Sequence, residues 1–288
     1  MSRVQDPTTL VLLDGERLDA AAAAVPAAWP ALLRGEGIFE TFLVRDGQST
    51  PLLAAHDRRL AHSARLTGFD LAEGDLLAAY EEVDAVLPPG CWRVRLSILR
   101  GVDGAHHRLW TVGPEPPPQE EVAIQLSDFR IDPADPLAGA KTISRMGWQV
   151  ARRRAAEAGA FEAILCTVDG HLAEGTSSNL FWWQKGRLRT PSLDCGILGG
   201  VTRGAILAAC QEAGIPLEEG RFGPESLEEA EEVYLSNAVI GFVPTTRIVG
   251  VREDLPGRHG KALPRLRDAH RSYLASLDGS FRCQENRP

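Results

Sequence analysis

Lysine is almost absent from this chain of 288 residues. Only Lys141, Lys185 and Lys261 occur among its 31 basic side chains, and all the others are arginines. Arginine supplies charge, packing and carboxylate contacts, but its guanidinium does not deprotonate in proteins and so cannot do amine chemistry. Lys185 lies in a Gln-Lys-Gly turn and Lys261 in a polar stretch. Lys141 is therefore the lysine whose setting favours a chemical role.

Other features are also missing, and each absence excludes a class of protein. No run approaches about 18 consecutive apolar residues, so we expect no membrane-spanning helix. Residues 1–7 lack the charged-then-apolar pattern of a secretion signal. The five cysteines are odd in number and contain no C-x-x-C pair, which argues against a disulfide framework and a zinc site. These absences predict a cytoplasmic protein.

The charge and the histidine pattern argue against nucleic-acid binding and against metal binding. A net charge of −8 argues against a nucleic-acid surface. Arg152-Arg153-Arg154 is the one basic cluster, and on a predicted helix we expect it to be a solvated face. His106-His107 is the one histidine pair, and no other metal ligand accompanies it at a suitable spacing, so no metal is expected. A small molecule is the expected partner.

The apolar pattern predicts a mixed α/β protein. Alternating and continuous apolar runs favour strands over 9–14, 38–44, 92–98, 122–126, 162–168, 179–183 and 232–235. Amphipathic segments favour helices over 56–66, 75–87, 146–159 and 201–213. Tight turns are expected at Asp14-Gly15, Asp46-Gly47 and Lys185-Gly186.

A polar, proline-rich segment predicts a division into two domains. Asp-Pro-Ala-Asp-Pro-Leu-Ala-Gly lies within residues 128–140 and has the composition of an interdomain crossing. We therefore expect a first domain over 1–127, a linker over 128–137 and a second domain over 138–288.

Several short motifs have ordinary structural explanations when taken singly. Gly199-Gly200 before a helix can bring N–H groups to a phosphate, but is commonly only a turn. Glu174 stands among small polar residues, as a surface turn or helix cap would. His56-x-x-Arg59 can be one face of a helix.

Taken together, the motifs resemble one known family. In chain order they are Gly35-Glu-Gly-Ile-Phe39-Glu-Thr41, His56-x-x-Arg59-Leu60, Lys141, Glu174-Gly-Thr-Ser-Ser-Asn179-Leu-Phe, Thr190-Pro191 and Gly196-Ile-Leu198-x-Gly200-Val-Thr202-Arg203. This order and spacing are similar to those of the class IV aminotransferases, the fold-type IV pyridoxal-phosphate enzymes. The resemblance runs from about residue 34 to 250. It implies a two-domain α/β fold whose C-terminal domain binds pyridoxal 5'-phosphate, and a homodimer.

The resemblance also implies a role for each matching residue. Lys141 would hold the cofactor through its amine and later move protons, while Glu174 would keep the pyridine nitrogen protonated. The other cofactor contacts would be Arg59, Leu198, Val201, Thr202 and Asn237, with Leu198 on the ring face and the rest at the phosphate. Thr41 would assist proton transfer, and the substrate would meet Phe39, Arg100 and His107.

Two positions favour one activity within the family, and a third opposes it. Branched-chain aminotransferases usually have a tyrosine where this chain has Met146, and a glycine where it has Thr41. At both positions, this chain resembles the 4-amino-4-deoxychorismate lyases instead. These lyases often have an arginine at the position of Ala105, so Arg100 or His107 would have to bind the substrate carboxylate, or the substrate differs.

Three functions remain open from the sequence. The favoured one is a lyase that forms 4-aminobenzoate and pyruvate. The alternative is an aminotransferase acting on branched-chain or D-amino acids with a 2-oxo acid acceptor. A non-catalytic relative is disfavoured because Lys141 and Glu174 are both present.

Overall fold

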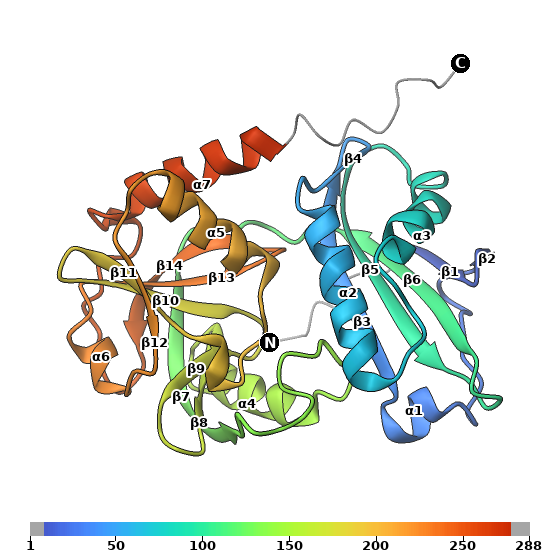
Figure 1. Cartoon of the computed structure of the whole chain (residues 1–288), viewed down its shortest axis with the longest axis horizontal. Helices are drawn as coiled ribbons and strands as arrows, with labels where there is room; N and C mark the ends of the chain where they lie inside the picture. Colours follow the sequence, from blue (N-terminus) through green and yellow to red (C-terminus); the bar gives the residue numbers. More distant parts are fainter. Residues whose placement is uncertain (1–8, 278–288) are drawn as a thin grey trace. The chain divides into compact units, whose positions relative to one another are not determined.

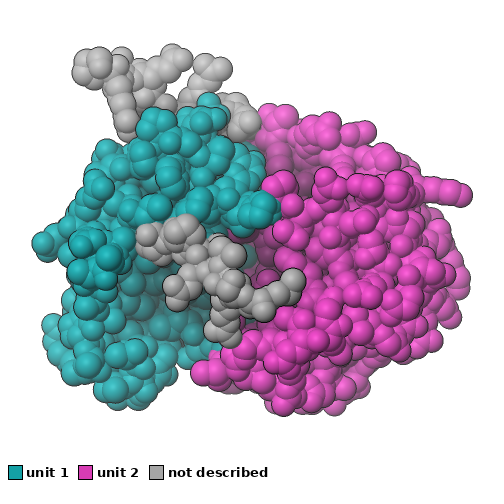
Figure 2. All heavy atoms as spheres, turned by 180° about the vertical axis from the view of Figure 1, so that it is seen from behind, with its two compact units in different colours: residues 1–117, 140–145 teal, residues 118–139, 146–288 magenta. Residues whose placement is uncertain are grey.

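The computed structural model describes residues 9–277, and their chain forms two compact units. Unit 1 consists of the residues up to Pro117 together with Ala140–Arg145, and unit 2 of Pro118–Gly139 with the residues from Met146 onward. Figure 2 shows the two units in separate colours. Residues 1–7, which were considered for a secretion signal, and Cys283 lie outside the described residues.

Unit 1 is built on one antiparallel sheet (Figure 1). The strand order is β2-β1-β6-β5-β3-β4. The strands are β1 (Leu10–Leu13), β2 (Glu16–Leu18), β3 (Gly37–Arg45), β4 (Gln48–Ser49), β5 (Cys91–Arg100) and β6 (His106–Pro114), and the helices are α1 (Pro30–Arg34), α2 (Leu53–Thr67) and α3 (Asp75–Asp84).

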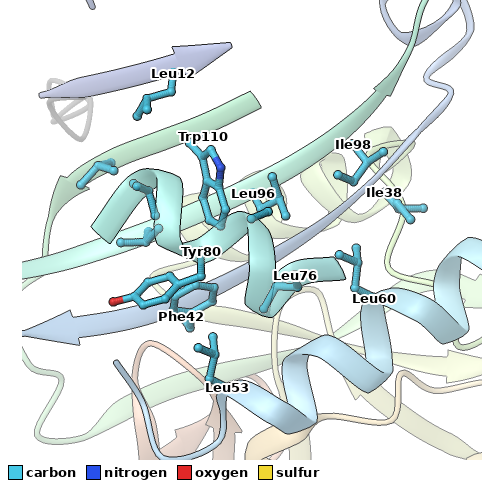
Figure 3. Packing of buried hydrophobic residues seen from close by; sticks show 14 of the residues in the cluster. Leu12, Ile38, Phe42, Leu53, Leu60, Leu76, Tyr80, Leu96, Ile98 and Trp110 are labelled. Atoms are coloured by element: carbon cyan, nitrogen blue, oxygen red, sulfur yellow. The ribbon is translucent and has the colours of Figure 1, made fainter. Parts of the chain in front are cut away.

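The core of unit 1 lies between its sheet and the helices α2 and α3. Phe42 on β3 is fully buried, and its ring lies 5.8 Å from Tyr80 of α3 and 6.5 Å from Trp110 of β6, measured between centroids (Figure 3). Leu53 and Leu60 of α2 pack into the same cluster. Because side chains alternate along a strand, this core takes every second residue of β3 and β5 and leaves the others for the opposite face.

Unit 2 contains an eight-stranded mixed sheet with the order β12-β11-β10-β13-β14-β7-β8-β9. An additional pairing of β9 with β10 closes six of these strands into a ring. The strands are β7 (Val122–Ile131), β8 (Glu162–Thr167), β9 (Leu172–Gly175), β10 (Asn179–Gln184), β11 (Arg187–Pro191), β12 (Leu217–Gly220), β13 (Glu232–Asn237) and β14 (Gly241–Ile248).

Unit 2 also contains helices. They are α4 (Met146–Glu157), α5 (Val201–Glu212), α6 (Glu225–Glu228) and α7 (Leu263–Leu277), with short 3-10 turns at Leu193–Cys195 and Gly257–His259. Ile124, Ile164, Leu180, Trp182 and Leu235 belong to one buried cluster, formed by alternate residues of neighbouring strands. The closed ring brings β9 and β10 edge to edge, and this pairing positions the candidate site of unit 2.

The three predicted tight turns are confirmed. In each, both central residues have positive φ, with 51° and 84° at Asp14-Gly15, 50° and 76° at Asp46-Gly47, and 51° and 77° at Lys185-Gly186. This is the conformation of the two-residue hairpin turn that matches the twist of paired strands.

The two compact units differ from the division expected from the sequence. Residues 122–127 were assigned to the first domain and 128–131 to the linker, but all of them belong to β7, which pairs with β8 and β14. Ala140–Arg145 was assigned to the second domain, but Thr142 forms a β-bridge with Ile38 and belongs to unit 1. The polar segment at 132–139 is therefore the crossing itself, and Lys141 lies beyond it in unit 1.

Among residues 9–277, no helix is long and apolar enough to cross a membrane. The same residues contain no cluster of three or more His, Cys, Asp or Glu side chains that could hold a metal ion.

Candidate active site

The backbone of Lys141 is held by two hydrogen bonds, one to the start of β3 and one to a side chain of α2. The N–H of Phe39 donates to the carbonyl of Lys141 over 2.9 Å, and the N–H of Lys141 donates to Ser63 Oγ on α2 over 3.0 Å. The Lys141 ammonium nitrogen lies 4.5 Å from the centroid of the Phe39 ring. The backbone of Lys141 is thus fixed on two sides, and its amine lies over an aromatic ring.

The glycines of the Gly35-Glu-Gly37 motif make room for this segment. A Cβ atom on Gly37 would lie 2.9 Å from the carbonyl oxygen of Ile98 and 2.7 Å from Ile143 Cδ1. The carbonyl of Gly37 accepts the N–H of Ile143 over 2.9 Å. A side chain at Gly37 would therefore push the Lys141 segment away from β3.

Phe39 and Thr41 share one face of β3, opposite the core face. Thr41 pairs directly with Arg95 on β5, and Phe39 pairs with Ser97. The Arg95 guanidinium carbon lies 3.7 Å from the Phe39 ring centroid, and its Nε donates to Ser97 Oγ over 3.1 Å. This face therefore presents an aromatic ring, a hydroxyl and a cation side by side.

Arg95 is a candidate that the sequence analysis missed. Burial is the main cause that lowers its pKa to about 10, with Arg145 and Arg93 contributing. Among residues 9–277, no carboxylate forms an ion pair with it. A poorly hydrated cation of this kind is suited to an anionic ligand. In the sequence, Arg95 was only one polar member of an alternating strand, which gave no signal of its position beside Phe39.

Arg59 forms a buried network with Glu40 and His56. Arg59 Nε and Nη2 donate to the two carboxylate oxygens of Glu40 over 2.8 and 2.7 Å, and His56 Nδ1 lies 2.7 Å from Glu40 Oε2. Burial alone would raise the pKa of Glu40, but the charge and hydrogen bonds of Arg59, and then His56, outweigh it and hold the pKa well below its usual value. Burial lowers the pKa of His56. Arg59 is thus oriented by a carboxylate that is ionised at neutral pH.

Arg100 and His107, expected at the substrate, are both held by protein groups. Arg100 donates to the carbonyls of Gly104 and Gly68 over 3.0 and 2.8 Å. His107 Nδ1 lies 2.7 Å from Asp14 Oδ2, and its ring stacks on Trp29 at 4.1 Å. Both residues lie at the end of the β5–β6 pair, whereas Arg95 lies in its middle.

In unit 2, Glu174 stands where β9 meets β10. It pairs with Asn179 in the ladder, and its side chain is 7% exposed. Its Oε2 accepts the N–H of Leu198 over 3.0 Å and the side-chain amide of Asn179 over 3.3 Å. The same amide donates to the carbonyl of Leu198 over 3.0 Å. Leu198 and Glu174 are therefore in direct contact, and Asn179 bonds to both.

The start of α5 lies next to this group. A Cβ atom on Gly200 would lie 1.8 Å from Asn179 Oδ1, so only glycine fits there. Gly200 is the N-cap of α5 and supplies no side-chain cap, and the helix begins with the buried pair Val201 and Thr202. The first N–H groups of a helix have no partners within it, and together with the helix dipole they favour an anion.

Asn237 uses its side chain to hold turns. Its Oδ1 accepts the N–H groups of Val239 and Ile240, each over 2.8 Å, and its Nδ2 donates to the carbonyl of Ser177 over 3.0 Å. Both polar groups of its side chain are thus engaged in holding turns.

Two other motif residues connect β11 to its neighbouring elements. Thr190 Oγ1 donates to the carbonyl of Leu180 over 2.8 Å, and Arg203 Nη2 donates to the carbonyl of Pro191 over 2.9 Å. These bonds fix β11 to β10 and to α5. Lys141, Phe39, Thr41 and Arg59 belong to unit 1, and Glu174 with the other predicted cofactor contacts belongs to unit 2.

Comparisons with known proteins identify the family of this chain. The family model described as amino-transferase class IV matches residues 37–248. The aminodeoxychorismate lyase of Bacillus subtilis is 29% identical over 256 residues, which are 83% of this chain and 86% of the lyase. A bifunctional aminodeoxychorismate lyase / D-amino acid transaminase of Mycobacterium tuberculosis is 30% identical over 258 residues, covering 80% and 88% of the two chains. The PLP-bound form of a hypothetical aminotransferase from Mycobacterium tuberculosis superposes with a TM-score of 0.80 at 26% identity, over 93% of this chain and 99% of that one.

Proposed function

Because the chain belongs to the class IV aminotransferase family, we propose that it is a 4-amino-4-deoxychorismate lyase that forms 4-aminobenzoate and pyruvate. The observation that supports this most strongly is the position of Thr41. Its side chain shares a strand face with Phe39, whose ring lies 4.5 Å from the Lys141 amine. A hydroxyl on the strand face that carries the ring beneath this amine is suited to proton transfer during elimination.

The family's cofactor is pyridoxal 5'-phosphate, and the residues present are chemically suited to it. Its aldehyde requires an amine, which Lys141 offers. Its pyridine nitrogen requires a carboxylate, and Glu174 is buried and already oriented by Leu198 and Asn179. Its phosphate requires N–H donors and a cation, which the start of α5 and Arg59 offer. When bound, the cofactor supplies an electron sink for the negative charge that develops on the substrate.

The chain's own residues would then move the protons of the reaction. The Lys141 amine would take the proton from the ring carbon of the substrate. Glu174 would keep a proton on the pyridine nitrogen. Thr41 or Lys141 would supply the proton that the departing enolpyruvyl group needs. The carbon–oxygen bond to that group breaks, the ring becomes aromatic, and no second substrate is consumed.

Arg95 supports a substrate with carboxylates. The proposed substrate has one carboxylate on its ring and another on its enolpyruvyl group. A cation with few water contacts, next to Phe39 and Thr41, could pair with one of them. We therefore add Arg95 to Arg100 and His107 as a candidate for substrate binding. We favour it because it lies beside Phe39 and Thr41, whereas Arg100 and the Nδ1 atom of His107 bond to other protein groups.

An aminotransferase acting on D-amino acids or branched-chain amino acids is the second candidate. The bifunctional relative, whose name includes both activities, favours it at 30% identity. The absence of an arginine at Ala105 also favours it, because that position is basic in many lyases. Met146, at the first position of α4 and 73% exposed, offers no hydroxyl to the cofactor, which counts against a branched-chain enzyme.

Product analysis separates the two candidates. Purified protein is incubated with aminodeoxychorismate and no 2-oxo acid, and the fluorescence of 4-aminobenzoate is followed. Sustained release supports the lyase; amino-group transfer from leucine or D-alanine to 2-oxoglutarate, without such release, contradicts it. We also propose a cytoplasmic homodimer acting in folate biosynthesis, for which light scattering on the purified protein gives the oligomeric state.

A further inference from the structure

Glu162 is a fully buried carboxylate that none of the roles above uses. It is the first residue of β8, pairs with Ile124 of β7, and is 0% exposed. An ionised group in such a position needs hydrogen bonds or an opposite charge to remain stable. The nearest cation is Arg152, whose Nη1 lies 3.7 Å from Glu162 Oε2.

Besides the N–H of Ala163, which donates to Oε1 over 3.0 Å, the hydrogen-bond donors come from one short turn that follows β9. Oε1 accepts the backbone N–H and the hydroxyl of Thr176, the first over 3.0 Å. Oε2 accepts the N–H and the hydroxyl of Ser177 over 3.1 and 2.8 Å, and the hydroxyl of Ser178 over 3.2 Å. Three consecutive residues thus direct five donors at a single carboxylate.

Further contacts define the shape of this turn. The N–H of Gly175 donates to the carbonyl of Ser178 over 2.7 Å. A Cβ atom on Gly175 would lie 2.3 Å from Ser178 Oγ and 2.9 Å from Glu162 Cγ, so the turn closes tightly on the carboxylate. Arg152 Nη1 donates to Ser177 Oγ over 2.6 Å, which leaves the proton of that hydroxyl for Glu162.

The turn lies next to Glu174 in the chain and leads to a residue that orients it. Gly175–Ser178 connects Glu174 directly to Asn179, and these two residues pair across the strand edge. The Asn179 amide donates to the Glu174 carboxylate, and the carbonyl of Ser177 accepts the Asn237 amide. A change in the turn would therefore move the carboxylate of Glu174 and the phosphate side of the site together.

We propose that Glu162 is a positioning residue: its carboxylate gathers the donors of residues 176–178 and so sets the position from which Glu174 meets the pyridine nitrogen. This inference rests on the proposed function, because it takes Glu174 as the partner of that nitrogen. Glu162 itself touches neither cofactor nor substrate in this scheme.

The substitution Glu162→Gln tests the proposal with little change in size. The new amide turns one acceptor into a donor, which faces the donors of Thr176 or Ser177, so the turn has to shift. Glu174→Gln is the comparison for the cofactor contact. Glu232→Gln is the matched control, because Glu232 is another buried carboxylate of unit 2, 5% exposed, that accepts the Tyr234 hydroxyl and the Ala262 N–H over 2.5 and 2.7 Å.

Two measurements are made on each holoenzyme, alongside its melting temperature. Amide hydrogen exchange reports the turn, and nitrogen-15 NMR of cofactor labelled at the ring nitrogen reports whether that nitrogen is protonated. In Glu162→Gln we expect roughly tenfold faster exchange over residues 175–179 and a ring-nitrogen signal displaced in the same direction as in Glu174→Gln. Glu232→Gln should lower the melting temperature and leave both signals unchanged.

The outcomes distinguish this inference from the proposed function. If Glu174→Gln displaces the ring-nitrogen signal and Glu162→Gln does not, the positioning role is wrong and the role of Glu174 stands. If Glu174→Gln leaves the signal in place, the proposed contact is wrong and the inference fails with it. Should Glu162→Gln not fold, Ser178→Ala removes one donor to Glu162; the same displacement, smaller in size, supports the proposal, and an unchanged signal overturns it.

Discussion

Arg59 and Glu40 form a two-point ion pair inside unit 1, with both carboxylate oxygens accepting from one guanidinium at 2.8 and 2.7 Å. Glu40 is 0% exposed, so its charge depends on this partner and on His56. Arg59, which is expected to hold the cofactor phosphate, thus also stabilises a buried carboxylate of unit 1.

The first prediction follows from that double role. Arg59→Ala should release the cofactor on dialysis and also lower the free energy of unfolding by about 3 kcal/mol, because it leaves a buried carboxylate without its main partner. Urea unfolding and cofactor absorbance measure the two effects. Arg58→Ala is the control, because its side chain is exposed on the same helix, and it should change neither quantity. Equal cofactor loss in both variants would refute the phosphate role.

The second prediction concerns pH. Burial lowers the pKa of His56 below 6.5, so on acidification the unfolded chain takes up a proton that the folded chain does not. The pKa of Glu40 is also depressed, so its contribution is present above its unfolded pKa of 4.5 and is lost at lower pH. The free energy of unfolding should therefore fall below about pH 6.5, with a slope of up to about 1.4 kcal/mol per pH unit for each such group.

Urea unfolding between pH 4 and 8 measures this slope. His56→Gln should flatten it below about pH 6.5, where the unfolded chain begins to take up the proton that the folded His56 does not; below 4.5, the unfolded pKa of Glu40, that carboxyl group contributes as well. His62→Gln, on the exposed side of the same helix, should keep the slope of the unmodified protein. An unchanged slope in His56→Gln would contradict the prediction.

The third prediction identifies the lysine that holds the cofactor. Borohydride reduction should fix the pyridoxyl group on the peptide that contains Lys141, because this amine lies over Phe39 while Lys185 and Lys261 are exposed. Peptide mass spectrometry gives the labelled position. A label on Lys185 or Lys261 would refute the assignment.

Much of this arrangement could be predicted from the sequence, and its limits have physical reasons. Local signals gave the hairpin turns and the start of α5, because Asp-Gly, Lys-Gly and Gly-Gly restrict the backbone by themselves. The family resemblance was confirmed by the match over residues 37–248. The placement of Lys141 in unit 1 could not be predicted, because it depends on the bridge between Thr142 and Ile38, which are far apart in the chain.

Arg95 and Glu162 were missed for a related reason. Arg95 looked like an ordinary polar residue of an alternating strand, and Glu162 like the polar start of an apolar one. Their significance comes from neighbours on other strands: Phe39 for Arg95, and the turn after β9 for Glu162. The role of a buried charged residue becomes clear only when its neighbours in the folded structure are known.

The fourth prediction tests the hydroxyl of Thr41. Thr41→Val keeps the shape and the preference for a strand but removes the hydroxyl, and should slow 4-aminobenzoate formation by about a hundredfold or more. Thr41→Ser should retain most of the rate. Thr111→Val is a matched control, because Thr111 pairs with Arg95 from the other side of β5. Similar rates for Thr41→Val and Thr111→Val would show that the hydroxyl takes no part.

The number of turnovers without an amino-group acceptor tests the proposed activity most directly. Purified enzyme, saturated with pyridoxal 5'-phosphate and freed of 2-oxo acids, is mixed with excess aminodeoxychorismate, and 4-aminobenzoate and pyruvate are counted per protomer. A lyase should form both in equal amounts over many turnovers, with its aldehyde-form absorbance retained. Product formation that stops at one amino-group transfer per protomer, and resumes only when 2-oxoglutarate or pyruvate is added, would contradict the lyase and identify an aminotransferase.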